Sequence, residues 1–123
     1  MRKGEIYYAA LGPIIGSEQG GIRPVVVIQN DMGNRHSPTT IVAPMTTQNK
    51  TRLPTHVSVT ICGKQNTILL EQIRSISRIR LIFKYGELSD SEMDQVNQAI
   101  MVSLGLPGAC DHTDRKNPNT KSC

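Results

Sequence analysis

One arginine in this sequence stands in a local setting that suits it to binding a phosphate. Arg23 follows the paired glycines Gly20 and Gly21 and precedes Pro24. Glycine lets a backbone adopt positive φ or approach a ligand closely, and a proline disfavours the helical region for the residue before it. We therefore expect Arg23 in extended backbone at the start of a strand. There its permanently charged guanidinium can bind two phosphate oxygens at once.

The residues after Pro24 predict the strand that would carry this arginine. Val25 to Ile28 is an unbroken run of four β-branched residues, a pattern typical of a strand buried on both faces. Two interpretations of the stretch stand on spacing alone. Arg23 is either a displayed functional cation or an ordinary solvated charge on a glycine turn that leads into a core strand.

A family resemblance bears on this choice. Residues 17–31 (SEQGGIRPVVVIQND) resemble the signature segment of the MazF/PemK family of toxin endoribonucleases, also called mRNA interferases. Further matching segments follow in the family's order: Arg2-Lys3-Gly4-Glu5-Ile6-Tyr7, Pro44-Met45-Thr46-Thr47-Gln48, Leu53-Pro54-Thr55-His56-Val57 and Leu69-Leu70-Glu71-Gln72-Ile73-Arg74-Ser75. The resemblance covers residues 2–106 and does not extend to residues 107–123.

The resemblance implies the toxin of a toxin–antitoxin pair. Such a protein is a sequence-selective, ribosome-independent and metal-independent endoribonuclease, which cleaves single-stranded mRNA, leaves a 2′,3′-cyclic phosphate and a 5′-hydroxyl, and causes growth arrest. It implies no cofactor, a homodimer, and a small acidic cognate antitoxin as a partner besides the RNA substrate.

Two other functions are alternatives to this one. A non-enzymatic, gyrase-poisoning toxin of the same fold superfamily would reach gyrase with a C-terminal end that contains tryptophan, whereas this chain has no Trp and ends Lys121-Ser122-Cys123. A peptide-binding module of the SH3 kind would need more aromatic residues to line a groove for proline-rich ligands.

The resemblance also assigns roles to individual residues. Arg23 and Thr46 form the catalytic pair, in which Arg23 stabilises the developing charge and the Thr46 hydroxyl contacts the scissile phosphate. Glu18 occupies the position proposed as general base or acid in some relatives, although a solvated loop carboxylate is an equal alternative. His56 is either an RNA contact or a half-exposed strand histidine. The predicted substrate-binding residues are Ser17, Gln19, Gly20, Gly21, Thr47, Gln48 and His56.

The surroundings of these residues carry further expectations. Gln19 to Gly21 is expected to act as a mobile lid over the RNA. Glu71, Gln72 and Arg74 are expected to form a structural polar network beneath it. The chain has only four aromatic residues, three Tyr and one Phe, so we expect base recognition by hydrogen bonds without a wide stacking platform.

Composition limits the class of protein. The 123 residues suffice for one domain, and the net charge of +4 permits a polyanionic partner without requiring one. The three cysteines lack metal-ligand spacing, and neither a signal peptide nor a membrane-spanning apolar run is present. We therefore expect a cytoplasmic protein without a metal and without a membrane segment.

The pattern of apolar residues predicts a mainly β fold with a C-terminal helix, and the resemblance implies a small SH3-like barrel of the MazF/CcdB-type toxin fold. Residues 1–106 would form this single domain, and residues 107–123 a disordered tail. Strands are expected over residues 4–11, 23–29, 39–45, 56–61, 67–75 and 82–88, with turns at 30–34 and 63–66 and a short helical turn at 77–81.

The C-terminal helix has the clearest sequence signature. Ser89 and Glu92 stand in capping-box spacing at its start. Met93, Val96, Ile100 and Leu104 fall on one face at helical spacing, which predicts a helix lying across the sheet.

Overall fold

The computed structural model describes residues 1–13, 15, 16, 18–48 and 52–108. Within them, seven strands form one bent antiparallel sheet in the order β4-β5-β3-β2-β1-β7, and β6 pairs with a second part of β3. The elements are β1 Glu5–Ala10, β2 Ile22–Val27, α1 Asp31–His36, β3 Thr39–Thr46, β4 His56–Ile61, β5 Lys64–Leu69, η1 Leu70–Gln72, β6 Arg74–Ser77, η2 Arg78–Arg80, β7 Leu81–Glu87 and α2 Asp90–Leu104.

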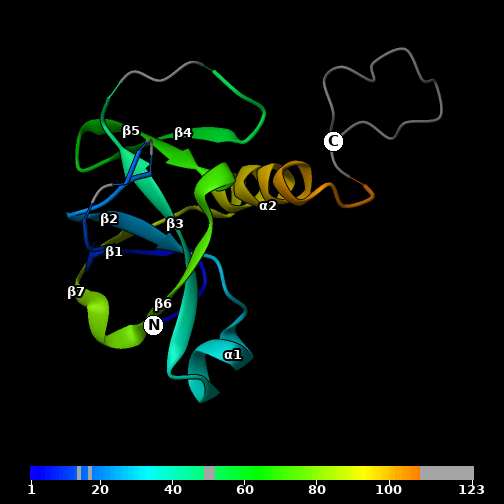
Figure 1. Ribbon diagram of the computed structural model, residues 1–123. Coiled ribbons are helices and arrows are strands. Elements are labelled where there is room, and N and C mark those ends of the chain that lie inside the picture. The colour runs from blue at the N-terminus through cyan, green and yellow to red at the C-terminus, as the bar shows by residue number, and fades with distance from the viewer. Residues whose placement is uncertain (14, 17, 49–51, 109–123) are drawn as a thin grey trace, which may run out of the picture.

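Strand β3 connects the different parts of the bent sheet. It pairs with β2 along one edge, and along the other with β6 through Thr39–Val42 and with β5 through Met45 and Thr46. Figure 1 shows β4 and β5 at one end of the molecule, α1 at the opposite end and α2 beside the sheet. The predicted mainly β barrel with a C-terminal helix is confirmed.

Apolar side chains of alternate strand positions form two separate cores, because successive residues of a strand point to opposite faces. The larger core lies between the sheet and α2 and includes Val26, Met45, Ile68 and Val96. The smaller core covers the other face; its buried members are Ala9, Leu11, Val25, Val27, Val42 and Ile76. Buried residues on both faces of β2 confirm that Val25 to Val27 form a core strand.

Several element predictions hold and several need correction. Strand β4 has the predicted bounds and alternation, and the capping box at Ser89 is present. The strand expected over residues 67–75 is wrong, because the 3₁₀ turn η1 separates β5 from β6 and redirects the chain. The turn expected at 30–34 is instead the short helix α1, whose N-terminus is capped by the Asn30 side chain accepting the Gly33 N–H at 2.8 Å.

The packing face of α2 also differs from the prediction at one end. Val96 and Ala99 are buried, and Met93 and Ile100 pack against the larger core. Leu104, expected on the same face, is 59% exposed. Helix α2 ends at Gly105 in the left-handed conformation, and the Leu106 N–H donates to the Met101 carbonyl. The last turn of the helix therefore extends beyond the sheet that it covers.

An ion pair joins β1 to β7, the strand at the edge of the sheet. The Glu5 carboxylate accepts the Lys84 ammonium at 2.7 Å and the Arg2 backbone N–H at 2.7 Å. Burial acts to raise the pKa of Glu5, but the hydrogen bond with Lys84, the Arg2 N–H and the Lys84 charge together outweigh it. The pKa of Glu5 is therefore lowered.

We expect Glu5→Gln to reduce the free energy of unfolding at pH 7 by about 1.5 kcal/mol, the scale of a lost charge-assisted hydrogen bond. Because the folded-state pKa is depressed, this stabilisation is present above the unfolded pKa of about 4.3 and disappears as pH falls through the folded value. Urea unfolding of wild type and variant between pH 2 and 8 measures the difference.

Glu87→Gln is the matched control, since Glu87 lies 3.8 Å from the same ammonium but its side chain is 70% exposed. Equal losses of stability for the two variants, or a loss for Glu5→Gln that does not change with pH, would contradict this account.

Candidate active site

The register between β2 and β3 brings Arg23 and Thr46 together. Val25 pairs with Pro44 and Val26 with Ala43, so the same register continued by two residues places Arg23 opposite Thr46. Residues directly opposite in an antiparallel pair share one face of the sheet. Arg23 and Thr46 also line one pocket of about 310 Å³, together with Thr47 and Gln48.

Both side chains keep hydrogen-bonding capacity for a ligand. The Arg23 Nε donates to the Gly20 carbonyl at 2.8 Å, which fixes the guanidinium, and its terminal nitrogens have no partner in the described part of the chain. The Thr46 hydroxyl oxygen accepts the Gln48 N–H at 3.2 Å, so its own O–H can still donate. A fixed cation and a neighbouring donor are the groups that a phosphate with developing charge requires.

Hydrogen bonds hold the glycine-containing segment before Arg23 in place. The Gln19 N–H donates to Oε1 of Gln72 at 2.9 Å, and the Leu11 N–H donates to the Gly21 carbonyl at 2.8 Å. Gly21 has φ +71°, a conformation that other residues rarely adopt. These hydrogen bonds hold Gln19 and Gly21 against neighbouring parts of the structure. The expected motion of this segment as a lid stays a prediction, and Ser17 lies outside the described residues.

Glu18 is not brought to the pair. Its side chain is exposed and lines none of the three pockets. Among the described contacts, its backbone N–H donates to the Ile15 carbonyl at 3.0 Å, and its carboxylate has no partner. A role as general base or acid therefore stays a prediction that would need this segment to change conformation.

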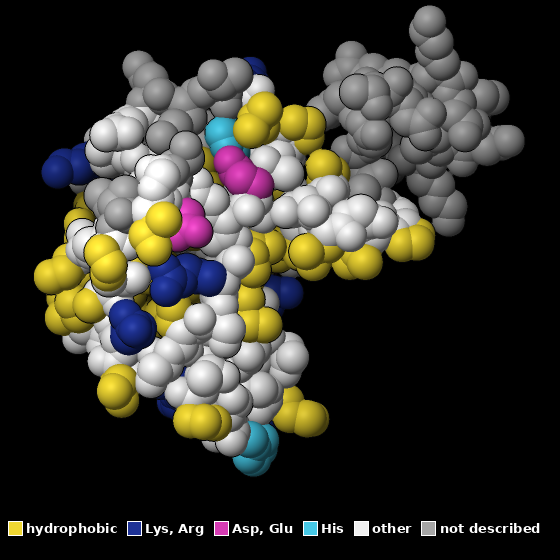
Figure 2. All heavy atoms as spheres, in the orientation of Figure 1, with side chains coloured by type: hydrophobic (Ala, Val, Ile, Leu, Met, Phe, Trp, Pro, Cys, Tyr) yellow, Lys and Arg dark blue, Asp and Glu magenta, His cyan; other side chains and the backbone are white. Residues whose placement is uncertain are grey.

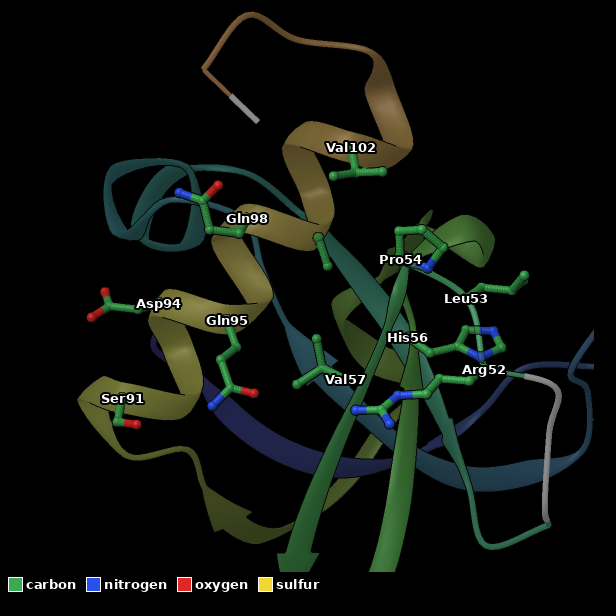
Figure 3. A pocket seen from close by; sticks show the side chains of 11 residues that line it. Arg52, Leu53, Pro54, His56, Val57, Ser91, Asp94, Gln95, Gln98 and Val102 are labelled. Atoms are coloured by element: carbon green, nitrogen blue, oxygen red, sulfur yellow. The ribbon is translucent and has the colours of Figure 1, made fainter. Parts of the chain in front are cut away.

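His56 lies in neighbouring hollows and not in the pocket of Arg23 and Thr46. It contributes to a pocket of about 710 Å³ lined by residues of α2 and by residues 52–57, where its ring lies beside Leu53 and Arg52 and points away from α2 (Figure 3). It also lines a third pocket, of about 490 Å³, with Thr47 and Gln48. Thr47 and Gln48 line both this pocket and the pocket of Arg23 and Thr46, so they connect the surroundings of His56 to those two residues.

His56 is held rigidly. Its Nε2 lies 2.7 Å from Oε2 of Glu71, whose other oxygen accepts the Thr55 hydroxyl at 3.2 Å. The side chain is only 7% exposed, and its buried Nδ1 has no hydrogen-bond partner in the described structure. The half-exposed strand histidine considered from sequence is therefore an almost buried side chain.

The predicted polar network beneath the loop is present in divided form. Gln72 binds the Gln19 backbone, and the Arg74 Nη1 donates to the Leu11 carbonyl at 3.2 Å, so both support the segment that leads to Arg23. Glu71 instead binds His56. The three residues serve two regions because η1 turns the chain between them.

Sequence reasoning missed a group of aromatic residues beside the first pocket. Tyr8 stacks on Phe83 with ring centroids 4.9 Å apart, and Tyr85 meets Tyr8 edge-on, also at 4.9 Å. Tyr8 and Tyr85 line the pocket of Arg23 and Thr46. Burial raises the pKa of Tyr85, and Cys62 and Tyr8 raise it further, so its hydroxyl keeps its proton at neutral pH. Only the pairing of β1 with β7 reveals this group, because these residues are far apart in sequence.

The described residues hold neither a candidate metal site nor a candidate membrane span. They contain no group of three or more His, Cys, Asp or Glu side chains placed to hold a metal ion. None of their helices has the length and apolar character needed to cross a membrane.

We expect Gln72→Ala to release the segment before Arg23, because Gln72 Oε1 is the acceptor that holds the Gln19 N–H. Amide hydrogen exchange should show loss of protection at Gln19, with slower exchange retained in β2 and β3. Gln65→Ala is the control, since Gln65 is exposed on β5. Unchanged protection at Gln19 in Gln72→Ala would show that this bond does not hold the segment.

Comparison with known proteins identifies a matching family. Residues 2–104 match the family described as "PemK-like, MazF-like toxin of type II toxin-antitoxin system". The chain is 54% identical over 111 residues to Endoribonuclease MazF of Staphylococcus saprophyticus, covering 86% of this chain and 92% of the relative. It is 50% identical over 111 residues to Endoribonuclease EndoA of Bacillus subtilis, covering 86% and 96%.

A solved structure supports the same assignment. An endoribonuclease in complex with its cognate antitoxin, from a mycobacterial species, superimposes with a TM-score of 0.75 at 25% identity, covering 87% of this chain and 97% of that one.

Proposed function

We propose that this chain, which belongs to the PemK-like, MazF-like toxins of type II toxin–antitoxin systems and is an endoribonuclease of the MazF type, cleaves single-stranded mRNA with Arg23 and Thr46 as its catalytic residues. The observation that carries this assignment is the β2–β3 register, which supports one phosphate-binding site made of a fixed guanidinium and a hydroxyl donor. The gyrase-poisoning alternative is not favoured, since the similar relatives are named endoribonucleases.

The proposed reaction is an attack of the RNA's own 2′-hydroxyl on the adjacent phosphorus. The P–O5′ bond breaks, the 2′-hydroxyl loses its proton and the leaving 5′-oxygen gains one, which gives a 2′,3′-cyclic phosphate and a 5′-hydroxyl. Arg23 binds the phosphoryl oxygens through its terminal nitrogens, and Thr46 donates its O–H to one of them, so both stabilise the charge that develops. Thr47 and Gln48 extend the binding surface toward His56.

The assembly and location that we propose follow the family. The protein acts in the cytoplasm as a homodimer and is inhibited by a small acidic antitoxin. Large apolar side chains are exposed on and next to β7, namely Ile79 at 91%, Ile82 at 53% and Phe83 at 52%, and this supports burial by a partner. Figure 2 shows hydrophobic side chains on the left side of the molecule and along α2, and Lys and Arg side chains near the centre of the same face.

The cleavage proposal predicts a defined reaction and defined losses. Purified protein incubated with a long RNA in EDTA should release fragments with 2′,3′-cyclic phosphate and 5′-hydroxyl ends. Arg23→Ala and Thr46→Val should each lower kcat/KM at least ~100-fold while remaining folded, the scale of losing one oxyanion donor. Thr46→Ser should retain most activity because it keeps the hydroxyl.

Arg35→Ala removes an exposed cation on α1 and serves as the matched charge control. Absence of cleavage by the wild type, 5′-phosphate ends, or near-full activity of a folded Arg23→Ala protein would each contradict the proposed mechanism.

Inhibition by the antitoxin should depend on salt in a defined way. An acidic segment that folds on binding would compete with RNA for the cationic site, and long-range attraction chiefly accelerates encounter. We expect added salt to lower the association rate more than it raises the dissociation rate, as stopped-flow measurements would show. Antitoxin binding that leaves RNA affinity unchanged would exclude competition.

The predicted disordered tail, residues 107–123, lies largely outside the described residues. We propose that it serves neither reaction nor inhibition. A protein ending at Leu106 should therefore keep both.

A further inference from the structure

Three of the four aromatic residues form a continuous surface at one end of the sheet. Tyr8 on β1 stands opposite Phe83 on β7 and contacts it face to face, with an interplanar angle of 24°. The β1–β7 register shifts between Ile6 and Tyr7, which leaves Tyr85 as an extra residue in β7. Bulges of this kind redirect side chains and are common beside active sites. Here Tyr85 lies edge-on to Tyr8 at 71°.

This surface and the catalytic pair reach the same pocket from opposite faces of the sheet. Tyr8 pairs with Pro24, whereas Arg23 pairs with Ala9, so alternation directs Tyr8 and Arg23 to different faces. The pocket of about 310 Å³ nevertheless includes both, because it lies where β2 begins and β3 ends. A nucleotide strand that crosses these strand ends can place a phosphate at Arg23 and an adjacent base at Tyr8 and Tyr85.

Two polar residues of β5 complete the pocket. Lys64 is exposed, and its ammonium has no partner in the described structure. Asn66 is only 3% exposed; its Nδ2 donates to the Lys64 carbonyl at 3.1 Å, and its Oδ1 makes no described hydrogen bond. Both side chains lie on one face of β5, since they are two residues apart. The pocket thus offers an aromatic surface, a cation and an amide acceptor.

We propose that this pocket is a subsite for one unstacked nucleotide next to the scissile phosphate, an assignment that rests on the proposed RNA cleavage. Its base stacks on Tyr8 and Tyr85, Asn66 accepts a hydrogen bond from the base edge, and Lys64 binds the phosphate on the far side of that nucleotide. The volume is at the lower end of the range of about 300–1,000 Å³ for small-ligand pockets, which suits one nucleotide and not a longer segment. Cleavage specificity therefore includes a stacking contribution at one position.

The test uses the full-length protein and a short RNA with one cleavage site, found first by mapping cuts in a long RNA. Two further substrates each lack the base at one position flanking the cut. We expect Tyr85→Ala to raise KM for the intact RNA about tenfold, the scale of a lost base–aromatic stack, with Tyr85→Phe close to wild type. The KM of the wild type should rise by a similar factor on one of the two abasic substrates. On that substrate Tyr85→Ala should raise KM no further.

Lys64→Ala provides an independent arm. The slope of log Kd against log salt for an uncleavable 2′-deoxy substrate should become shallower by about 0.7, the value for one phosphate contact on a single strand. Lys3→Ala is the matched control, because Lys3 is exposed and lines none of the three pockets. An unchanged slope in Lys64→Ala would remove Lys64 from the subsite.

A fluorescence measurement covers the case in which Tyr85→Ala does not fold. 2-Aminopurine placed at each flanking position of the uncleavable RNA should be quenched on binding to wild type at one position. Equal effects of Tyr85→Ala on intact and both abasic substrates, or no quenching at either position, would overturn the subsite while leaving RNA cleavage established. Wild type that cleaves no RNA would instead overturn the proposed function.

Discussion

The pairing register of β2 with β3 is the constraint on which the site depends. A shift by one residue would turn Arg23 to the opposite face from Thr46, because strand side chains alternate. The register is specified by burial on both faces: Val26 and Ala43 enter the larger core, and Val25 and Val42 the smaller one. The same apolar residues that stabilise the sheet therefore hold together the two polar side chains of the proposed phosphate-binding site.

The remaining contacts around the site fix backbone that the sheet itself does not. Gln72 and Arg74 bind the segment that precedes Arg23, and Gly20 accepts the Arg23 Nε. A guanidinium held in advance loses little freedom when it binds a phosphate, so more of the interaction is available in the transition state. His56 is fixed separately by Glu71, in hollows that Thr47 and Gln48 connect to the pair.

Sequence predicted local features well and long-range placement less well. The valines of β2, the alternation of β4 and the capping box at Ser89 are local signals, and each is confirmed. The break between β5 and β6 could not be predicted, because residues 67–75 are continuously strand-like and tertiary pairing ends the strand. The aromatic group was missed for a related reason: composition counts Tyr and Phe but does not reveal which strands become neighbours.

The central claim is that one phosphate is bound by Arg23 and Thr46 together. A crystal structure with an RNA whose cleavage is blocked by a 2′-deoxy nucleotide tests it most directly. The account predicts the scissile phosphate at hydrogen-bond distance, about 3 Å, from both the Arg23 guanidinium and the Thr46 hydroxyl. A scissile phosphate bound beside Glu18 or His56, with neither Arg23 nor Thr46 in contact, would contradict it.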